Sequence, residues 1–286
     1  MVTKKNKVID LSIVIATHNR PNELKSLIDS IFESELPNYE ILLIGTSKND
    51  FQFVDDKNNI IKIVSDKKNQ VYQRNVGFQK SNGKYILQVD DDIIFGNNAI
   101  KLLYDKILKS RKTILSINLL NSNGEKAYKR WVEIYNSNKF FRNLIFFLNG
   151  FKKVRPYSVI SSGRPVPYFS NENINNYEKS EWLNSCFMFS DTALNDYKKN
   201  ISSGKAFYED IFTTHNFFHM GYKLKTLEEA QGFHPITDPM DFFTHLRTIK
   251  NQFVIVRKFK KSFVLFFFDL IIFSLIFFIY NFKNKR

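Results

Sequence analysis

Residues 11–109 alternate between short apolar runs and segments with helical periodicity. The run at 11–16 is almost wholly apolar and ends in polar residues, which is typical of a strand buried on both faces of a sheet. Pro21 then opens a segment whose apolar residues recur at the spacing of one helix face. Strands and helices alternating at these lengths predict an α/β fold with a doubly wound, mostly parallel sheet and flanking helices.

The other elements are expected from the same two periodicities. Further strands are expected at residues 40–44, 60–64, 85–89, 113–120, 128–134, 181–190 and 222–227. Helices are expected between Pro21 and Pro37, at 70–80, from Asn97 or Asn98 to 109, and at 139–153, 191–199, 209–219 and 239–260. The stretch at 155–177 is expected to be rich in loops.

Three adjacent carboxylates, Asp90, Asp91 and Asp92, end the apolar run at 85–89. Adjacent negative charges repel one another unless a cation lies among them. A divalent cation such as Mg²⁺ or Mn²⁺, bound through oxygens and shared with substrate phosphates, meets that need. Because ligands bind at the carboxyl ends of strands in open α/β folds, the triplet indicates a metal and phosphate site. For the triplet alone, a solvated acidic turn is the alternative.

The chain is strongly basic, with a net charge of +14 over 286 residues. Such a charge is compatible with a nucleic-acid partner, but its distribution argues against one. From Lys250 onward the sequence has eight basic residues and one acid, and these surround a hydrophobic segment. Basic residues gathered around an apolar segment indicate an anionic membrane surface as the partner, and no nucleic acid.

The hydrophobic segment runs from Phe263 to Tyr280 and contains two polar residues, Asp269 and Ser274. A helix of this length spans about 27–30 Å, close to the thickness of the hydrocarbon core of a bilayer. We therefore expect a single membrane-associated helix at 263–280, with a re-entrant or in-plane helix and a buried core helix as the alternatives. The segment at 139–153 has the composition of a helix in a membrane interface, or of an ordinary buried amphipathic helix.

The expected compartment is reducing, because Cys186 is the single cysteine and cannot form an internal disulfide. No secretory signal is visible near residues 4–20, where a short apolar segment is interrupted by Asp10. We therefore expect an inner-membrane protein whose catalytic domain lies on the cytosolic side.

Five segments in this order make the chain recognisable: SIVIATHNR, EILLIGTSKND, YQRNVGFQKSNGKYILQVDDDI, WLNSCFMFS and FYEDIFTTHNFFHMGYKL. Together they resemble the family 2 glycosyltransferases of GT-A fold over residues 10–230. The resemblance implies transfer of a sugar from a nucleotide-sugar donor to an acceptor hydroxyl. It divides the chain into a GT-A-like domain at 1–250, with a nucleotide-binding half (8–112) and an acceptor half (113–235), and a basic linker with the membrane helix at 251–286.

On the donor side, the resemblance implies a set of residues around the nucleotide and a metal ion. Asp90 and Asp92 match the family's metal-binding DxD element, with Asp92 as the direct ligand of Mn²⁺ or Mg²⁺. His234, just beyond the last strand, is expected to complete the metal's shell, as in some GT-A enzymes. The resemblance places the following residues at the nucleotide-sugar: Thr17, Arg20, Arg74, Asn75, Asp90 and Asp91.

On the acceptor side, Glu209 and Asp210 match the family's acidic pair. A carboxylate within hydrogen-bond reach of the acceptor hydroxyl can take its proton while the new bond forms. The resemblance makes Asp210 that base, Glu209 an orienting group, and Trp182 an aromatic residue near the acceptor. Alone, an acidic pair at a helix start is explained by capping and by the helix dipole, and a tryptophan by core packing.

The chain departs from the family pattern after its second strand, where an acid that contacts the nucleotide base is common. Gly45, Thr46 and Ser47 stand there instead, and Asp66, after the third strand, is the candidate for base recognition. The expected function is a metal-dependent inverting glycosyltransferase that acts on a glycan or lipid-linked acceptor, such as a polyprenyl-linked glycan of a surface polysaccharide. The alternatives are a degenerate membrane-bound nucleotide-sugar binder and a nucleotidyltransferase.

Overall fold

A computed structural model of the chain describes residues 9–126, 129–150, 157–166, 180–194, 208–235 and 242–284. The chain forms two compact units, and each is discontinuous in sequence. Unit 1 comprises Met1–Gly124 and Leu183–Pro235, and unit 2 comprises Glu125–Trp182 and Ile236–Arg286. The sequence division at residue 250 differs from this one, because residues 125–182 join the C-terminal helices rather than the sheet.

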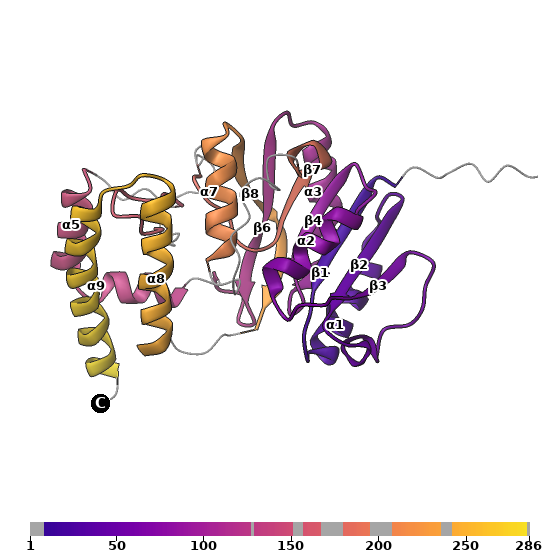
Figure 1. Ribbon diagram of the computed structural model, residues 1–286, viewed down its shortest axis with the longest axis horizontal. Helices are drawn as coiled ribbons and strands as arrows, with labels where there is room; N and C mark the ends of the chain where they lie inside the picture. Colours follow the sequence, from indigo (N-terminus) through magenta and orange to yellow (C-terminus); the bar gives the residue numbers. More distant parts are fainter. Residues whose placement is uncertain are drawn as a thin grey trace, which may run out of the picture. The chain divides into compact units, whose positions relative to one another are not determined.

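Unit 1 is built on an eight-stranded sheet with the order β3-β2-β1-β4-β7-β6-β8-β5 (Figure 1). Its strands are β1 (Leu11–Ala16), β2 (Tyr39–Gly45), β3 (Ile60–Val64), β4 (Tyr85–Asp90), β5 (Ile94–Phe95), β6 (Thr113–Asn121), β7 (Phe187–Ser190) and β8 (Lys223–His234). Strands β3, β2, β1 and β4 are parallel, and so are β6 and β8. Strand β7 is antiparallel to both β4 and β6, and β5 is antiparallel to β8. The expected mostly parallel sheet is confirmed.

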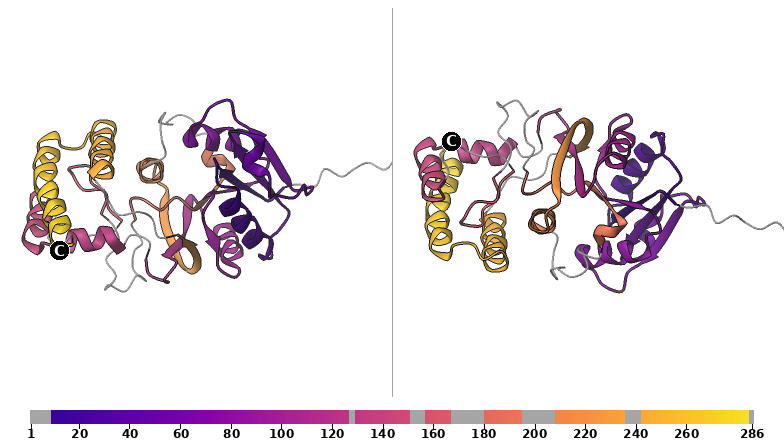
Figure 2. Two further views of the ribbon diagram at one scale, coloured as in Figure 1. Left: turned by 90° about the horizontal axis from the view of Figure 1, so that it is seen from below. Right: turned by 90° about the horizontal axis from the view of Figure 1, so that it is seen from above.

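The helices of unit 1 lie on both faces of the sheet, as Figure 2 shows for the indigo and purple segments. Among the described residues they are α1 (Pro21–Phe32), α2 (Gln70–Lys80), α3 (Ala99–Leu108) and α7 (Glu209–His219), with short 3₁₀ turns η1 (Lys48–Phe51) and η3 (Asp191–Ala193). The chain leaves β1 toward β2 through α1, but leaves β3 toward β4, on the other side of β1, through α2. Right-handed crossovers that run in opposite directions place their helices on opposite faces, and the sheet has its switch point between β1 and β4.

The pairing register aligns the ends of the three central strands. Ala16 of β1 pairs with Ile44 of β2 on one side and with Asp90 of β4 on the other. All six residues of β1 are buried, as the apolar run predicted. The residues that follow these three strands therefore meet at one edge of the sheet.

Unit 2 is helical and contains α4 (Lys129–Asn136), α5 (Lys139–Leu148), α8 (Phe242–Lys258) and α9 (Phe263–Asn284). Its core joins Ile134 of α4, Ile145 and Phe146 of α5, and Phe273 and Ile276 of α9. Among the described residues, one helical segment, Phe263–Phe282, is long and apolar enough to cross a membrane, with a mean hydropathy of 2.6.

Four expectations for the second half of the chain differ from the structure. The strand expected at 128–134 is wrong, because residues 129–136 form α4 and pack on other helices through Ile134. A run this short does not distinguish a strand from a buried helix by periodicity alone. Of the range 181–190, only Phe187–Ser190 forms a strand, which is β7. The strand expected at 222–227 is longer than expected and continues as β8 to His234. Of the helix expected at 191–199, residues 195–199 lie outside the described residues, and the described part forms η3.

Candidate functional site

The carboxylate triplet lies at the switch point of the sheet. Asp90 is the last residue of β4, and Asp91 and Asp92 form the turn after it, beside the end of β1. Thr17 follows β1 directly and its backbone N–H donates to the carbonyl of Ile44, so it stays in the plane of the sheet. The parallel register thus brings together residues that the sequence analysis placed at the nucleotide.

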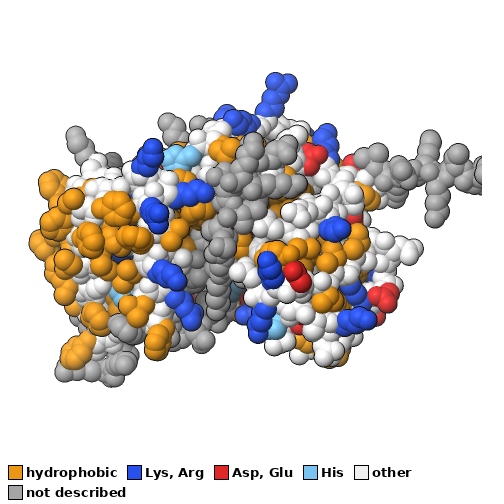
Figure 3. Space-filling model, in the orientation of Figure 1, with side chains coloured by type: hydrophobic (Ala, Val, Ile, Leu, Met, Phe, Trp, Pro, Cys, Tyr) orange, Lys and Arg blue, Asp and Glu red, His pale blue; other side chains and the backbone are white. Residues whose placement is uncertain are grey.

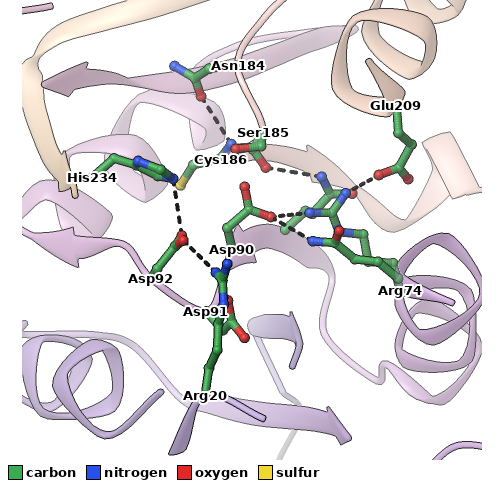
Figure 4. A network of polar contacts seen from close by, with 12 residues as sticks. Arg20, Arg74, Asp90, Asp91, Asp92, Asn184, Ser185, Cys186, Glu209 and His234 are labelled. Carbon is green, nitrogen blue, oxygen red and sulfur yellow. Dashed lines mark hydrogen bonds and ion pairs between the residues drawn. The ribbon is translucent and has the colours of Figure 1, made fainter. Parts of the chain in front are cut away.

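Cations surround the triplet on the side of Asp91 and Asp92 (Figure 4). Arg20 Nη1 donates to Asp92 Oδ2 at 2.7 Å and to Asp91 Oδ1 at 3.2 Å. His234 Nε2 lies 3.3 Å from Asp92 Oδ1, and its Nδ1 donates to the carbonyl of Pro235 at 2.7 Å. The Arg20 side chain is 50% exposed, so this guanidinium can leave the carboxylates without opening the fold.

Burial and charge act differently on neighbouring groups of the triplet. Burial raises the pKa of Asp91 to about 6, although the Thr17 hydroxyl and Arg20 oppose the rise. Burial would also raise the pKa of Asp92, but His234 and Arg20 outweigh it and lower the pKa of this carboxyl. The pKa of His234 is raised, because Asp92 outweighs the effect of burial, which alone would lower it. Asp92 is therefore firmly ionised at neutral pH.

Arg74 connects the triplet to the acidic pair at the start of α7. Its side chain, on α2, is 2% exposed and forms ion pairs with both Asp90 and Glu209 (Figure 4). Gln70, one helical turn earlier, lies 3.3 Å from Asp90 through its Nε2. Arg74 was expected at the nucleotide, whereas Gln70 was not among the expected site residues. The signal was present, because residues four apart on a helix share a face.

The close contact of α2 with the sheet fixes the position of Arg74. A Cβ atom on Gly77 would lie 2.4 Å from Val14 Cγ1 and 2.7 Å from Ile44 Cδ1, so α2 approaches β1 and β2 where this residue has no side chain. Gln73 Nε2 donates to the carbonyls of Thr17 and Ile44 at 2.9 and 2.7 Å. Asn75, the remaining residue of this motif predicted at the donor, is half-buried.

Asp210 has the properties of a proton acceptor at neutral pH. It follows Glu209 in the first turn of α7, and it is surrounded by protein yet still reached by solvent. Burial raises its pKa to about 7, the Asp90 and Glu209 charges add to the rise, and the Ile211 backbone N–H and Arg74 oppose it. A carboxylate with a pKa near 7 accepts protons far better than an ordinary aspartate does.

Asp50 takes a structural role in the loop after β2, where the family's acid is missing. Its carboxylate accepts hydrogen bonds from the backbone N–H groups of Asn19, Thr46 and Ser47 at 2.7–3.0 Å. These hydrogen bonds outweigh burial and lower the pKa of Asp50. Asp50 therefore ties the loops after β1 and β2 together, and Asp66, beyond β3, is exposed to solvent.

Trp182 belongs to unit 2, where it is fully buried and packs edge-on against Tyr157. The segment that follows it belongs to unit 1 and is hydrogen-bonded to β4. Gln88 of β4 donates through Nε2 to the carbonyl of Ser185 at 3.0 Å, and Asn184 accepts from the Cys186 N–H at 3.0 Å (Figure 4). Ser185 is thus linked to the strand that ends in the triplet.

The expected metal ligands fit a divalent cation in part. Asp92 and His234 present an oxygen and a nitrogen 3.3 Å apart, and both donor types suit Mn²⁺. Asp90 is directed instead toward Arg74 and Gln70. Within the described part of the chain, no group of three or more His, Cys, Asp or Glu side chains is arranged to hold a metal ion.

Comparison with known proteins identifies the class. The family model described as glycosyl transferase family 2 matches residues 12–197, and the chain therefore belongs to this family. A protein named "Uncharacterized glycosyltransferase" from Rickettsia bellii is 27% identical over 144 residues, which cover 47% of this chain and 20% of that protein. A protein with the same name from Haemophilus influenzae is 27% identical over 88 residues, 30% of each chain. The chain thus spans less than a third of the length of either relative.

Two solved structures share the fold of the chain. GalNAc-T7 with UDP, GalNAc and Mn²⁺ matches with a TM-score of 0.60 at 15% identity, covering 87% of this chain and 48% of that one. Residues 1–349 of S. aureus TarS in complex with UDP-GlcNAc match with a TM-score of 0.56 at 13% identity, covering 87% and 66%. The sheet and its helices are therefore of the GT-A type.

Proposed function

We propose that the protein is a metal-dependent, inverting glycosyltransferase that moves a sugar from a nucleotide-sugar donor to an acceptor hydroxyl. The observation that carries the proposal is the network at the switch point, in which Arg74 joins a donor-side carboxylate, Asp90, to the acidic pair that contains Asp210. Family membership supports the same reaction class. A partly buried acid with a pKa near 7, such as Asp210, is typical of functional sites at the ligand-binding edge of such a sheet.

On the donor side, Asp92 and His234 would hold a divalent cation, Mn²⁺ or Mg²⁺. Such an ion supplies charge stabilisation for the diphosphate as it leaves the sugar. Arg20 is the mobile cation of this group, since its half-exposed side chain can turn from Asp91 and Asp92 to a phosphate. We place Thr17, Asn75 and Asp66 along the nucleoside.

On the acceptor side, Asp210 takes the proton of the attacking hydroxyl. The acceptor oxygen forms a bond to the anomeric carbon while the bond from that carbon to the diphosphate oxygen breaks, and the proton passes to the Asp210 carboxylate. A single displacement of this kind inverts the anomeric configuration. Glu209, held by Arg74, keeps the start of α7 in place and does not itself receive the proton.

For the acceptor we propose a polyprenyl-linked glycan at the cytosolic face of the inner membrane, in the synthesis of a surface polysaccharide. The support is the basic charge of the chain and the apolar helix α9. A substrate anchored in the bilayer is reached most readily by an enzyme that is held at the same surface.

The testing experiment is nucleotide binding by the detergent-solubilised full chain. UDP, GDP, dTDP and CMP are titrated with and without Mn²⁺. Asp92→Ala is the variant, and Asp105→Ala, which changes an exposed residue of α3, is its matched control. UDP comes first because two structures of the same fold hold UDP or UDP-GlcNAc. We expect metal-dependent binding of one diphosphate nucleotide that Asp92→Ala abolishes and Asp105→Ala keeps.

Two other results of that titration would contradict the proposal. Binding that is indifferent to Mn²⁺ and to Asp92 would remove the metal, and Arg20 would become the principal partner of the diphosphate. If none of the four nucleotides binds, the absence of an acid after β2 has disabled the donor site. Such a chain would have lost its donor site, and the proposal of nucleotide-sugar transfer would fail.

A further inference from the structure

The acidic residue of the apolar C-terminal helix is fixed inside unit 2. Arg164 approaches Asp269 Oδ2 through Nε at 2.7 Å and through Nη2 at 2.6 Å, and both side chains are 1% exposed. Gln252 of α8 donates to the same oxygen at 2.8 Å. Three segments, the stretch before residue 166, α8 and α9, are thus joined at one carboxylate. Asp269 has its partners within the protein and needs none from lipid.

Helix α9 has two apolar faces with different surroundings. One face packs into unit 2 and consists of Phe266, Asp269, Ile272, Phe273, Ile276 and Phe277, all at most 8% exposed. The other is a stripe at helical spacing whose members are 45–66% exposed: Val264, Phe267, Phe268, Ile271, Leu275, Phe278 and Phe282. A helix that crosses a bilayer alone presents lipid on every side and has no use for a packed face with a buried ion pair.

The exposed stripe has apolar neighbours on α5 and α8. Phe140 and Phe147 of α5 are 71% and 77% exposed, and Phe243 of α8 is 68% exposed. Figure 3 shows hydrophobic side chains gathered over this part of the molecule, with Lys and Arg side chains along its border. Among the side chains that the structure describes on these helices, the exposed basic ones are Lys139, Arg247, Lys250, Arg257 and Lys258, with Lys260 in the turn before α9.

We propose that unit 2 docks on an anionic lipid bilayer in the plane of its surface, with the stripe of α9 in the headgroup region and α9 not crossing. This deepens the membrane association proposed above. Crossing would carry α8, with Arg247 and Lys250, and the Arg164–Asp269 pair into hydrocarbon, where charges are costly. Apolar aromatic side chains bordered by lysine and arginine are the composition of an interfacial helix that prefers anionic lipid.

The first test asks on which side of the membrane the two ends of α9 lie. Single cysteines are introduced by Ser262→Cys and Lys283→Cys; the natural Cys186 is fully buried and gives a low background. The full chain is synthesised in the presence of sealed vesicles and exposed to a membrane-impermeant maleimide. We expect both positions to react without detergent. Protection of Lys283→Cys until detergent is added would show that α9 crosses, and would overturn the proposal.

The second test asks which surface and which lipid are used. Binding of the full chain to vesicles is measured by flotation. Vesicles of phosphatidylcholine alone are compared with vesicles that also contain phosphatidylglycerol. We expect binding to be stronger with phosphatidylglycerol, to weaken with salt, and to fall at least tenfold in Phe267→Ser/Ile271→Ser. The matched control is Phe53→Ser/Leu108→Ser, which removes two apolar residues exposed on unit 1 and is expected to bind as the unchanged protein does.

Two outcomes of flotation would overturn the proposal. In the first, the protein floats with neither kind of vesicle. In the second, the protein is self-associated, and Phe267→Ser/Ile271→Ser changes its size but not its binding to vesicles. The second would assign the stripe to another copy of the chain. None of these measurements uses a sugar donor, so a failure of the proposed transfer reaction leaves them unaffected.

Discussion

Each unit of the molecule has a buried arginine in an ion pair, with two carboxylates in unit 1 and with Asp269 in unit 2, and the two arrangements differ in how far solvent reaches them. In unit 1, Arg74 is 2% exposed, but its partner Asp90 is 18% exposed and nearby Arg20 is half exposed. In unit 2, Arg164 and Asp269 are each 1% exposed. The same type of ion pair therefore serves two purposes. An open network can exchange partners with a charged ligand, whereas a closed one can only hold segments together.

The sharpest test of this difference is Asp210→Asn in unit 1. The substitution keeps the shape of the side chain but removes the proton acceptor, so we expect turnover to fall by about 10²–10⁴-fold. Nucleotide binding and melting temperature should change little, because Asp210 is not part of the Arg74 ion pairs. The measurement is kcat alongside nucleotide affinity, with Asp105→Asn as the control. Unchanged turnover would show that another group is the base.

The converse is expected for Asp269→Ala in unit 2. The change leaves the buried Arg164 guanidinium without the Asp269 carboxylate, and removal of one partner from a buried pair costs about 3–5 kcal/mol. Urea denaturation of the detergent-solubilised chain measures the free energy of unfolding, with the exposed Asp105→Ala as the control. Replacing both partners, as Arg164→Met/Asp269→Leu, should be markedly less damaging. A negligible loss in Asp269→Ala would mean that the pair does not hold α9 to the unit.

Gly77→Ala disturbs the open network without touching a charge. The added Cβ would meet Val14 Cγ1 and Ile44 Cδ1 well inside contact distance, and overpacking of this kind costs about 1–3 kcal/mol. Because α2 must move, Arg74 moves with it, and nucleotide affinity should fall together with stability. Gln79→Ala, exposed on the same helix, is the control. If stability falls while nucleotide affinity is unchanged, Arg74 does not belong to the donor site.

The smallest expected effect is the pH dependence of the reaction. Below its pKa of about 7, Asp210 is protonated and cannot accept a proton, so kcat/KM should rise about tenfold per pH unit up to 7 and then level off. The profile is measured on both sides of pH 7 in the unchanged protein and in Asp91→Asn, since the pKa of Asp91 is about 6. The rise should persist in Asp91→Asn. Its disappearance there would assign the titration to Asp91.

The parallel half of the fold could be read closely from the sequence. The strand at Ile60–Val64 and the helices at Gln70–Lys80 and Glu209–His219 have the predicted bounds. The strand is a short, mostly apolar run between polar residues, and α2 begins at a cap, Asn69, whose side chain accepts from the Tyr72 N–H. Helix α4 was missed, since its residues become helical through packing on α5 and α9. Long-range packing of this kind leaves no mark within a short window of sequence.

The sequence predicted which residues belong to the candidate site better than it predicted which of them contact one another. Asp92 and His234, predicted as two ligands of one metal ion, lie close together. Among the described residues, they are not joined by a third His, Cys, Asp or Glu side chain in an arrangement that could hold a metal ion. What the sequence could not give is the pairing of Arg74 with Glu209, which are 135 positions apart. Nor could it give the pKa of Asp210, because that depends on burial and on the charges of Asp90 and Glu209.

The discontinuity of unit 1 has a consequence for how the protein is made. Strand β7 fills the place between β4 and β6, yet it begins at Phe187, far beyond the end of β4 at Asp90. At ribosomal rates of about 5–20 residues per second, the edge of β4 waits roughly 5–20 s for its neighbour. An unpaired strand edge is a template for aggregation during that interval. Chains that end before β7 should therefore accumulate as insoluble material or bound to chaperones. In the full chain, β7 pairs with β4 and β6 and completes the sheet.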